Sequence, residues 1–388
     1  MDGASDIILI LTLGIIVGWL AKRFNQPSAV WLVLSGVIIG PPVLGWVTPS
    51  ETIYLLGELG VVLLLGMAGL HLGLGQLRGA GIPGILVALS GMLICFLGGF
   101  LFTEWWGSPF EESLYVGTIL TATSIGVSAQ VLHQFGLIDN SIGRIVIAAA
   151  VIDDVIALYL LAIAHNALTD GLSISNLATS IGLAAIVLAA VYILCMLVTR
   201  ALIRWLSTSQ PLVSLSFTVF LIVAMAVLTQ KLGYSSVVGG FFAGLGIGEA
   251  LPDNVRQRLL KQLTKLVFVL VPFFFMLIGA RAEWGVLSDP GMPTLFIGLV
   301  VVAITGKVLG GVFGAYTSKG LAQRLLIGVS MVPRGEVALV AAGLGFSQGH
   351  ISHHVLIALI LVVVTLALLG PMLTALLARR VAGHKTNV

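Results

Sequence analysis

Charged residues are scarce in this 388-residue chain, where Asp, Glu, Lys and Arg together make up 9% of the sequence. Soluble domains carry about 25% charged residues, so the shortage excludes an ordinary globular fold with a hydrated surface. Hydrophobic residues make up 58% of the chain, and a globular core of this size could not bury them all. We therefore expect a membrane protein whose solvent is the lipid bilayer, and we expect no nucleic-acid partner.

Cysteine is also rare, and the two cysteines, Cys95 and Cys195, both lie inside apolar runs. They are typical of small core residues and indicate no disulfide scaffold. The first residues, MDGASDIILI, include no basic segment and no small-residue cleavage site. We expect them to open a retained first span and not a signal peptide.

Apolar segments of about 20 residues are long enough to cross the hydrocarbon layer as helices. Thirteen such spans are predicted, near residues 5–23, 29–47, 52–72, 82–103, 112–134, 142–167, 176–200, 211–231, 234–250, 264–281, 293–316, 322–347 and 353–378. An odd number of spans places the two termini on opposite sides of the membrane. If the N-terminus is outside, Lys231 and Arg281 are the only basic loop residues on the outer side. Since basic loops stay in the cytoplasm, we expect the N-terminus outside and the C-terminus inside. The basic amphipathic segment 252–265 is predicted to form a surface helix in the headgroup layer.

Few ionisable residues remain within the predicted spans. They are Glu58, Asp153, Asp154, Lys307, Arg334 and Glu336. A charge at the bilayer centre costs about 2.5–3.5 kcal/mol on insertion scales, and such residues usually mark an ion or proton path. Adjacent residues on a helix point about 100° apart, so Asp153 and Asp154 face different partners. We expect one aspartate to pair with Lys307 and the other to hold a mobile cation.

Two further signals lie at the same depth. Thr121, Thr123 and Ser124 cluster in the middle of span five, and Pro333 and Gly335 are predicted to break span twelve. Broken membrane helices expose backbone carbonyls and half-helix dipoles, which suit ion binding in transporters.

A weak internal repeat joins these regions. Aligning Gly117 with Gly328 superposes YVGTILTATSIG on LIGVSMVPRGEV and carries Asp154 onto Thr365. An odd number of crossings separates the two segments, which predicts an inverted repeat. Glycines recur every four residues in spans nine and eleven and predict close helix packing.

These features together resemble the monovalent cation:proton antiporters, and among them the bacterial NapA type of sodium/proton antiporter. The resemblance covers essentially the whole chain. It implies an all-α membrane fold of 13 transmembrane helices with inverted repeats and two crossing discontinuous helices, spans five and twelve. The domains that it implies are dimerisation segments 1–81 and 208–290, core ion-transport segments 82–170 and 291–380, a linker helix 171–207 and a cytoplasmic tail 381–388.

The same resemblance implies roles for single residues. Asp154 would bind Na⁺ and carry the proton, and Asp153 would pair with Lys307 and could also contact the metal ion. Thr123 and Ser124 would lie at the helix break. Arg334 and Glu336 would balance the half-helix dipoles. One departure is His71, where relatives commonly carry an acid.

We therefore expect a secondary active transporter and not an enzyme. It would exchange Na⁺ or Li⁺ for H⁺, electrogenically and by an alternating-access elevator mechanism, with the two ions competing for Asp154. We expect a homodimer in a bacterial inner membrane, with no cofactor besides the transported ions. The alternative is a K⁺/H⁺ antiporter or potassium-efflux-type transporter of the same fold, although those generally carry Gln-Asp instead of Asp-Asp. An intramembrane aspartyl protease would leave Lys307 unexplained, and a sensor that uses the fold without transport stays open.

Overall fold

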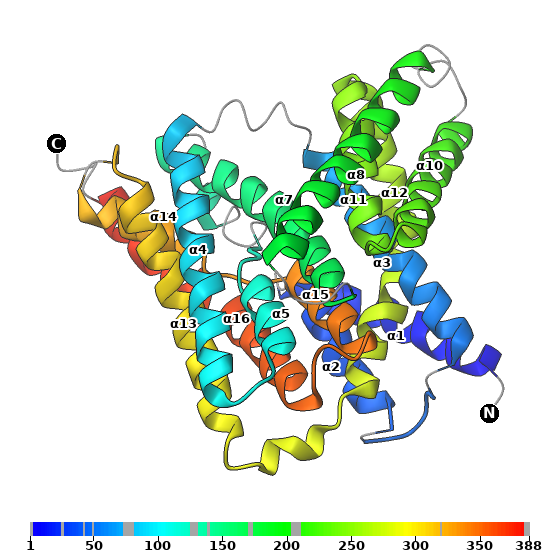
Figure 1. Cartoon of the computed structure of the whole chain (residues 1–388), viewed down its shortest axis with the longest axis horizontal. Coiled ribbons are helices and arrows are strands. Elements are labelled where there is room, and N and C mark those ends of the chain that lie inside the picture. The colour runs from blue at the N-terminus through cyan, green and yellow to red at the C-terminus, as the bar shows by residue number, and fades with distance from the viewer. Residues whose placement is uncertain are drawn as a thin grey trace. The chain divides into compact units, whose positions relative to one another are not determined.

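The computed structural model describes residues 3–24, 27–41, 43–48, 50–72, 81–124, 131–137, 140–169, 174–202, 211–318 and 320–383. All regular structure in these ranges is helical. The helices are α1 Gly3–Arg23, α2 Ser28–Ile39, α3 Glu51–Leu72, α4 Gly81–Trp106, α5 Phe110–Ile119, α7 Ser141–Thr169, α8 Ile174–Ala201, α10 Pro211–Lys231, α11 Ser236–Ala250, α12 Asp253–Arg281, η2 Trp284–Ser288, α13 Met292–Gly314, α14 Leu321–Ser330, α15 Glu336–Ser347 and α16 His353–Gly383 (Figure 1). Most of the predicted cytoplasmic tail lies outside the described residues.

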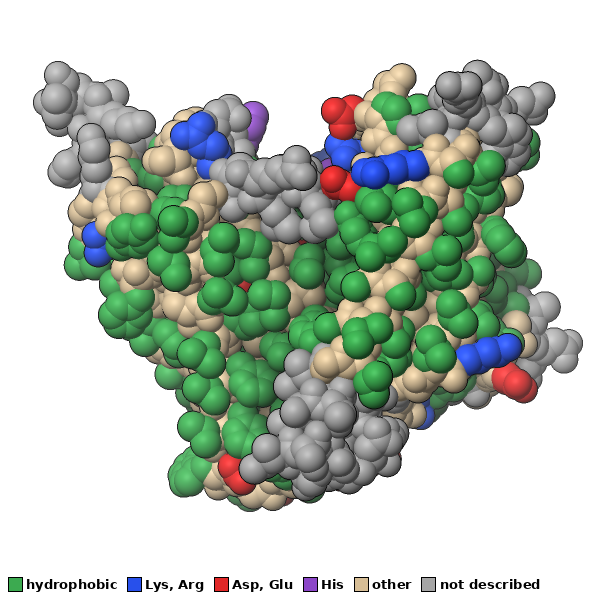
Figure 2. Space-filling view, turned by 45° about the horizontal axis from the view of Figure 1, so that its top comes forward, with side chains coloured by type: hydrophobic (Ala, Val, Ile, Leu, Met, Phe, Trp, Pro, Cys, Tyr) green, Lys and Arg blue, Asp and Glu red, His purple; other side chains and the backbone are tan. Residues whose placement is uncertain are grey.

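Nine helices in the described ranges are long and apolar enough to cross a membrane. Four shorter apolar helices, α2, α11, α14 and α15, accompany them. Hydrophobic side chains dominate the face in Figure 2, where Lys, Arg, Asp and Glu side chains appear at only a few places. Such a surface suits lipid and not water. The predicted all-α, multi-pass membrane architecture is therefore confirmed, while the count of thirteen crossings stays a prediction.

The chain divides into two compact units. The first unit contains residues 1–16, 38–76 and 158–280, and the second contains residues 17–37, 77–157 and 281–388. The predicted dimerisation and core domains concern assembly and motion, and they stay predictions.

Close packing of α3 against α11 organises the first unit. A Cβ atom on Gly240, Gly244 or Gly248 of α11 would crowd or overlap the backbone of α3. The predicted glycine stripe therefore lies at a helix–helix contact, where small residues let two backbones approach.

The second unit is built in the same way around α4 and α13, which run alongside each other in Figure 1. A Cβ atom on any of three α13 glycines would overlap α4. The contacts are, in order, Gly306 with Cys95, Gly310 with Gly91 and Gly314 with Val87. This stripe brings α13, which carries Lys307, against α4 without intervening side chains.

The helices of the second unit follow the internal repeat. The offset that carries Gly117 onto Gly328 also carries the ends of α5, Phe110 and Ile119, onto the ends of α14, Leu321 and Ser330. The same offset places the start of α4 on the start of α13. The weak sequence repeat therefore corresponds to equivalent helix boundaries.

The amphipathic segment 252–265 is not a separate surface helix as predicted. It forms the first half of α12, which runs without interruption from Asp253 to Arg281. Val255, Leu259 and Leu263 are buried at four-residue spacing, so the apolar face of this segment packs on protein. That packing explains why the helix continues.

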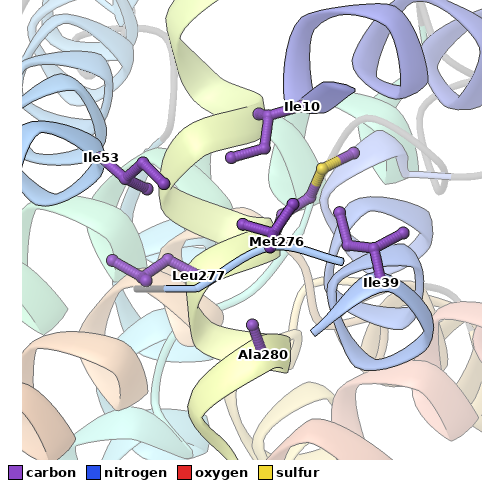
Figure 3. Close-up of a pocket in the computed structure, with 7 residues that line it drawn as sticks. Ile10, Ile39, Ile53, Met276, Leu277 and Ala280 are labelled. Carbon is purple, nitrogen blue, oxygen red and sulfur yellow. The ribbon is translucent and has the colours of Figure 1, made fainter. Parts of the chain in front are cut away.

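A small apolar pocket lies within the first unit, where α1, α2, α3 and α12 meet (Figure 3). Its lining residues are Ile10, Ile39, Val47, Ile53, Met276, Leu277 and Ala280. All seven are apolar, so the pocket offers no side-chain ligand for a cation. The candidate site lies in the second unit instead.

Candidate functional site

Two helices of the second unit are interrupted. α5 ends at Ile119, and residues 120–124 that follow are not helical. α14 ends at Ser330 and α15 begins only at Glu336. Pro333 lies in the second interruption, where its missing N–H prevents a continuous helical ladder. The predicted break in span twelve is therefore present, and span five is also unwound at its hydroxyl cluster.

The two unwound segments contact each other. The backbone N–H of Ser124 donates to the carbonyl of Pro333 over 2.8 Å. Arg334 donates from Nη1 to the carbonyl of Ala122, and the same Nη1 lies 3.3 Å from Thr123 Oγ1. A Cβ atom on Gly335 would lie 2.6 Å from Ser124 Oγ, so glycine is needed for this approach. The internal repeat aligns these two segments with each other, residues 122–124 with residues 333–335.

Lys307 is paired with Asp153. Its Nζ lies 2.5 Å from Asp153 Oδ2, and the two side chains are 2% and 0% exposed. Thr123 Oγ1 donates to the same oxygen over 2.8 Å. The unwound segment of span five therefore contacts the ion pair through the hydroxyl of Thr123. Asp153 is also the aspartate that the family resemblance pairs with Lys307.

Asp154 has a different environment. Its Oδ1 is buried, and no hydrogen-bond partner for it is found among the residues that the structure describes. Lys307 does not satisfy it, because its ammonium group is bound to Asp153. Within the described ranges, Oδ1 of Asp153 is a second buried oxygen without a partner. Each of the two neighbouring aspartates thus has one buried oxygen without a hydrogen bond from the described residues.

The half-helix ends carry charges that complement their dipoles. Arg334 is 1% exposed and reaches the carbonyl at Ala122, just after the C-terminal end of α5. Glu336 is in the first turn of α15, where the partial charge of the helix is positive. The compensation of the half-helix dipoles by these two residues stays a prediction.

The arrangement suits a hard monovalent cation or a proton. Carboxylate, hydroxyl and carbonyl oxygens gather at the two unwound segments, and these are the groups that hold Na⁺ and H⁺ in transporters with broken helices. In the part of the chain that the structure describes, no group of three or more His, Cys, Asp or Glu side chains could hold a metal ion. A dedicated transition-metal centre is therefore not built from the described residues.

Other ionisable residues make contacts apart from this pair of aspartates. Glu58 accepts a hydrogen bond from Ser236 Oγ over 3.0 Å, and both residues belong to the first unit. His353 lies 3.5 Å from Glu283, and His354 lies 2.6 Å from Asp289. His71 is exposed at the end of α3.

Sequence reasoning missed two partners of Arg334. The Ala122 carbonyl is a backbone group and leaves no signal in the sequence. The second partner is Cys95, whose Sγ lies 3.6 Å from Arg334 Nη2, and the apolar run around it predicts only an ordinary core residue. Its apolar surroundings along the chain gave no indication of a buried guanidinium.

Comparison with known proteins gives a consistent result over nearly the full length. The sequence model of the family described as "Sodium/hydrogen exchanger, transmembrane" matches residues 8–379. The Na⁺/H⁺-K⁺ antiporter GerN of Bacillus cereus is 31% identical over 372 residues, covering 94% of each chain. A Na⁺/H⁺ antiporter of Enterococcus hirae is 29% identical over 394 residues, covering 98% of this chain and 99% of its own.

The fold has a solved counterpart. The sodium proton antiporter MjNhaP1 of Methanocaldococcus jannaschii superposes with a TM-score of 0.74 over 97% of this chain and 98% of its own. At 19% sequence identity, this likeness concerns the arrangement of the helices alone.

Proposed function

The chain belongs to the sodium/hydrogen exchanger family, and from this membership and the geometry of the second unit we propose that it exchanges Na⁺ for H⁺ across a membrane. One observation carries the proposal. Lys307 neutralises Asp153, while the neighbouring Asp154 keeps a buried oxygen that no described residue satisfies. An acid in that position must hold either a proton or a cation, because an isolated buried carboxylate is very unfavourable.

Competition for this carboxylate gives a mechanism for antiport. Asp154 binds the cation when it is ionised and carries a proton when it is neutral, so one ion displaces the other. Thr123, Ser124 and the carbonyls of the unwound segments supply further oxygens for the cation. Arg334 and Glu336 keep the half-helix ends balanced while the charge at Asp154 changes.

The Asp153–Lys307 pair adds a second proton to the proposed cycle. A cation that contacts Asp153 Oδ1 weakens the attraction between Asp153 and Lys307, and Lys307 then releases a proton. Two protons exchanged for one Na⁺ would move net charge, so transport would be electrogenic. We propose that the core, segments 82–170 and 291–380, carries this site across the membrane in an elevator motion.

The remaining parts of the proposal concern assembly and place. The chain forms a homodimer through segments 1–81 and 208–290, and the linker helix, segment 171–207, connects these segments to the core. It lies in the bacterial inner membrane with an outer N-terminus and an inner C-terminus, as the distribution of Lys and Arg indicates. No cofactor is required beyond the transported ions.

A second candidate, K⁺/H⁺ antiport, is favoured by one observation. The relative from Bacillus cereus carries K⁺ as well as Na⁺ in its name. The oxygen ligands of the site do not by themselves discriminate between the two ions. Selectivity is therefore tested in the same assay as the function.

The experiment is cation-driven proton flux in proteoliposomes that hold the purified protein and a pH-sensitive dye. An outward Na⁺ gradient is expected to acidify the lumen in wild type and to leave it unchanged in Asp154→Asn. Asp289→Asn, whose side chain is 53% exposed, is the matched control and keeps wild-type flux. Replacing Na⁺ by Li⁺ or K⁺ gives the selectivity, and Na⁺-driven flux that survives in Asp154→Asn contradicts the assignment.

A further inference from the structure

The guanidinium of Arg334 is held from two sides. Its Nη1 donates to the Ala122 carbonyl and lies 3.3 Å from Thr123 Oγ1, both in the unwound part of span five. Its Nη2 donates to Cys95 Sγ over 3.6 Å, and Cys95 lies on a different helix, α4. The side chain is 1% exposed. Among the described residues, its Nε has no partner, so the sulfur is a substantial part of what fixes the group.

The position of Cys95 is itself fixed by packing. The residue is 0% exposed. A Cβ atom on Gly306 of α13 would lie 2.5 Å from its Sγ. The absence of a side chain at Gly306 therefore lets α13 pack directly against the sulfur. Its thiol also lies 3.9 Å from the Ala303 carbonyl, which it can donate to. The acceptor for Arg334 is therefore supplied by the rigid α4–α13 contact and not by a mobile loop.

A buried guanidinium that loses an acceptor seeks another, because an unsatisfied charged donor is costly. The carboxylate of Asp153 is a stronger acceptor close to this guanidinium. Thr123 Oγ1 lies 3.3 Å from Arg334 Nη1 and donates to Asp153 Oδ2 over 2.8 Å. The other oxygen of this carboxylate, Asp153 Oδ1, is buried and has no partner among the described residues. An arginine that turned to Asp153 Oδ1 would occupy an oxygen that the cation contacts in the proposed cycle.

We propose that Cys95 is a positioning residue for ion exchange: its sulfur holds Arg334 on the unwound segment of span five and away from the aspartate oxygens that bind the cation. The inference rests on the proposed function of Asp154. It adds a specific role for a residue on α4, a helix that contributes no other side chain to the ion path described above.

The test compares substitutions at Cys95 in the proteoliposome assay. Cys95→Ala removes the acceptor, and Cys95→Val removes it while filling the space of the sulfur. Both variants are expected to raise the apparent KM for Na⁺ by about threefold to tenfold, with little change in the maximal rate. The maximal rate persists because saturating Na⁺ displaces the arginine from the carboxylates.

Cys95→Ser and Cys195→Ala are the controls. A serine hydroxyl accepts a hydrogen bond and is expected to restore a KM within about twofold of wild type, since it replaces the weaker sulfur acceptor. Cys195 is also 0% exposed but belongs to the first unit, on α8. Its alanine variant is expected to keep the wild-type KM, which separates loss of the acceptor from loss of a buried thiol.

The outcomes distinguish this inference from the proposed function. Wild-type flux that depends on Asp154, together with an unchanged KM in both Cys95→Ala and Cys95→Val, overturns the positioning role alone. A fall in maximal rate without a change in KM, or a raised KM that serine does not restore, overturns it as well. Absence of Na⁺-driven flux in the wild type overturns the proposed function itself.

Discussion

The Asp153–Lys307 pair allows a sharp test of how the site is stabilised. The two groups are 0% and 2% exposed, with 2.5 Å between Oδ2 and Nζ. Removing one partner of a buried ion pair costs about 3–5 kcal/mol, because the remaining charge is left uncompensated. Lys307→Met and Asp153→Asn are therefore each expected to lower the free energy of unfolding by roughly that amount.

The double variant Asp153→Asn/Lys307→Met is expected to behave differently. It removes both charges while keeping side chains of similar size, and such replacements of buried pairs are often neutral or stabilising. We expect its free energy of unfolding to lie within about 1 kcal/mol of wild type. The coupling energy from the double-mutant cycle is then of opposite sign to the two single losses and close in size to their sum, about 6–10 kcal/mol.

Denaturant unfolding of the purified protein in detergent micelles measures all four proteins. Acidic buffer provides an internal check, because Asp153 in the Lys307→Met variant can take up a proton and become neutral. The loss of stability in that variant is therefore expected to grow as the pH rises. Single losses that simply add in the double variant, or a Lys307→Met variant as stable as wild type in alkaline buffer, would refute the buried pair.

Two further predictions concern exchange and packing. Because Na⁺ displaces protons from the site, the apparent KM for Na⁺ in flux measurements is expected to rise as the pH falls. The rise approaches about tenfold per pH unit for each proton displaced, and a KM that does not change with pH would exclude competition. Gly310→Ala places a Cβ atom against the backbone of Gly91, so unfolding measurements are expected to show a loss of at least about 1–3 kcal/mol. Gly182→Ala, on a helix face with nothing within 4 Å, is its matched control and is expected to show no loss; equal effects of the two would remove the close contact as an explanation.

Much of the fold was predictable because the bilayer imposes length and hydrophobicity on each helix. α3 and α10 begin and end within one residue of the predicted spans. The interruption before α15 was also predictable, since Pro333 lacks a backbone N–H and Gly335, two residues later, lowers helix stability further. The break after α5 has no such residue between Leu120 and Ser124, and only its hydroxyl cluster and the family resemblance pointed to it.

What could not be predicted depends on contacts between distant segments. The continuity of α12 follows from burial of its amphipathic half, which a sequence cannot distinguish from contact with headgroups. The choice of Asp153 as the partner of Lys307 depends on the rotation of α7, and the residues alone allowed either aspartate. Cys95 and the Ala122 carbonyl became visible only when α4 and both unwound segments were placed around Arg334.

The most direct test of the account is proton release when Na⁺ binds to the purified protein. NaCl is added to weakly buffered protein in detergent with a pH indicator, and choline chloride serves as the control for ionic strength. Wild type is expected to release protons on addition of Na⁺, and Asp154→Asn is expected to release none. Equal release from the two proteins would contradict the claim that Na⁺ and H⁺ exchange at Asp154.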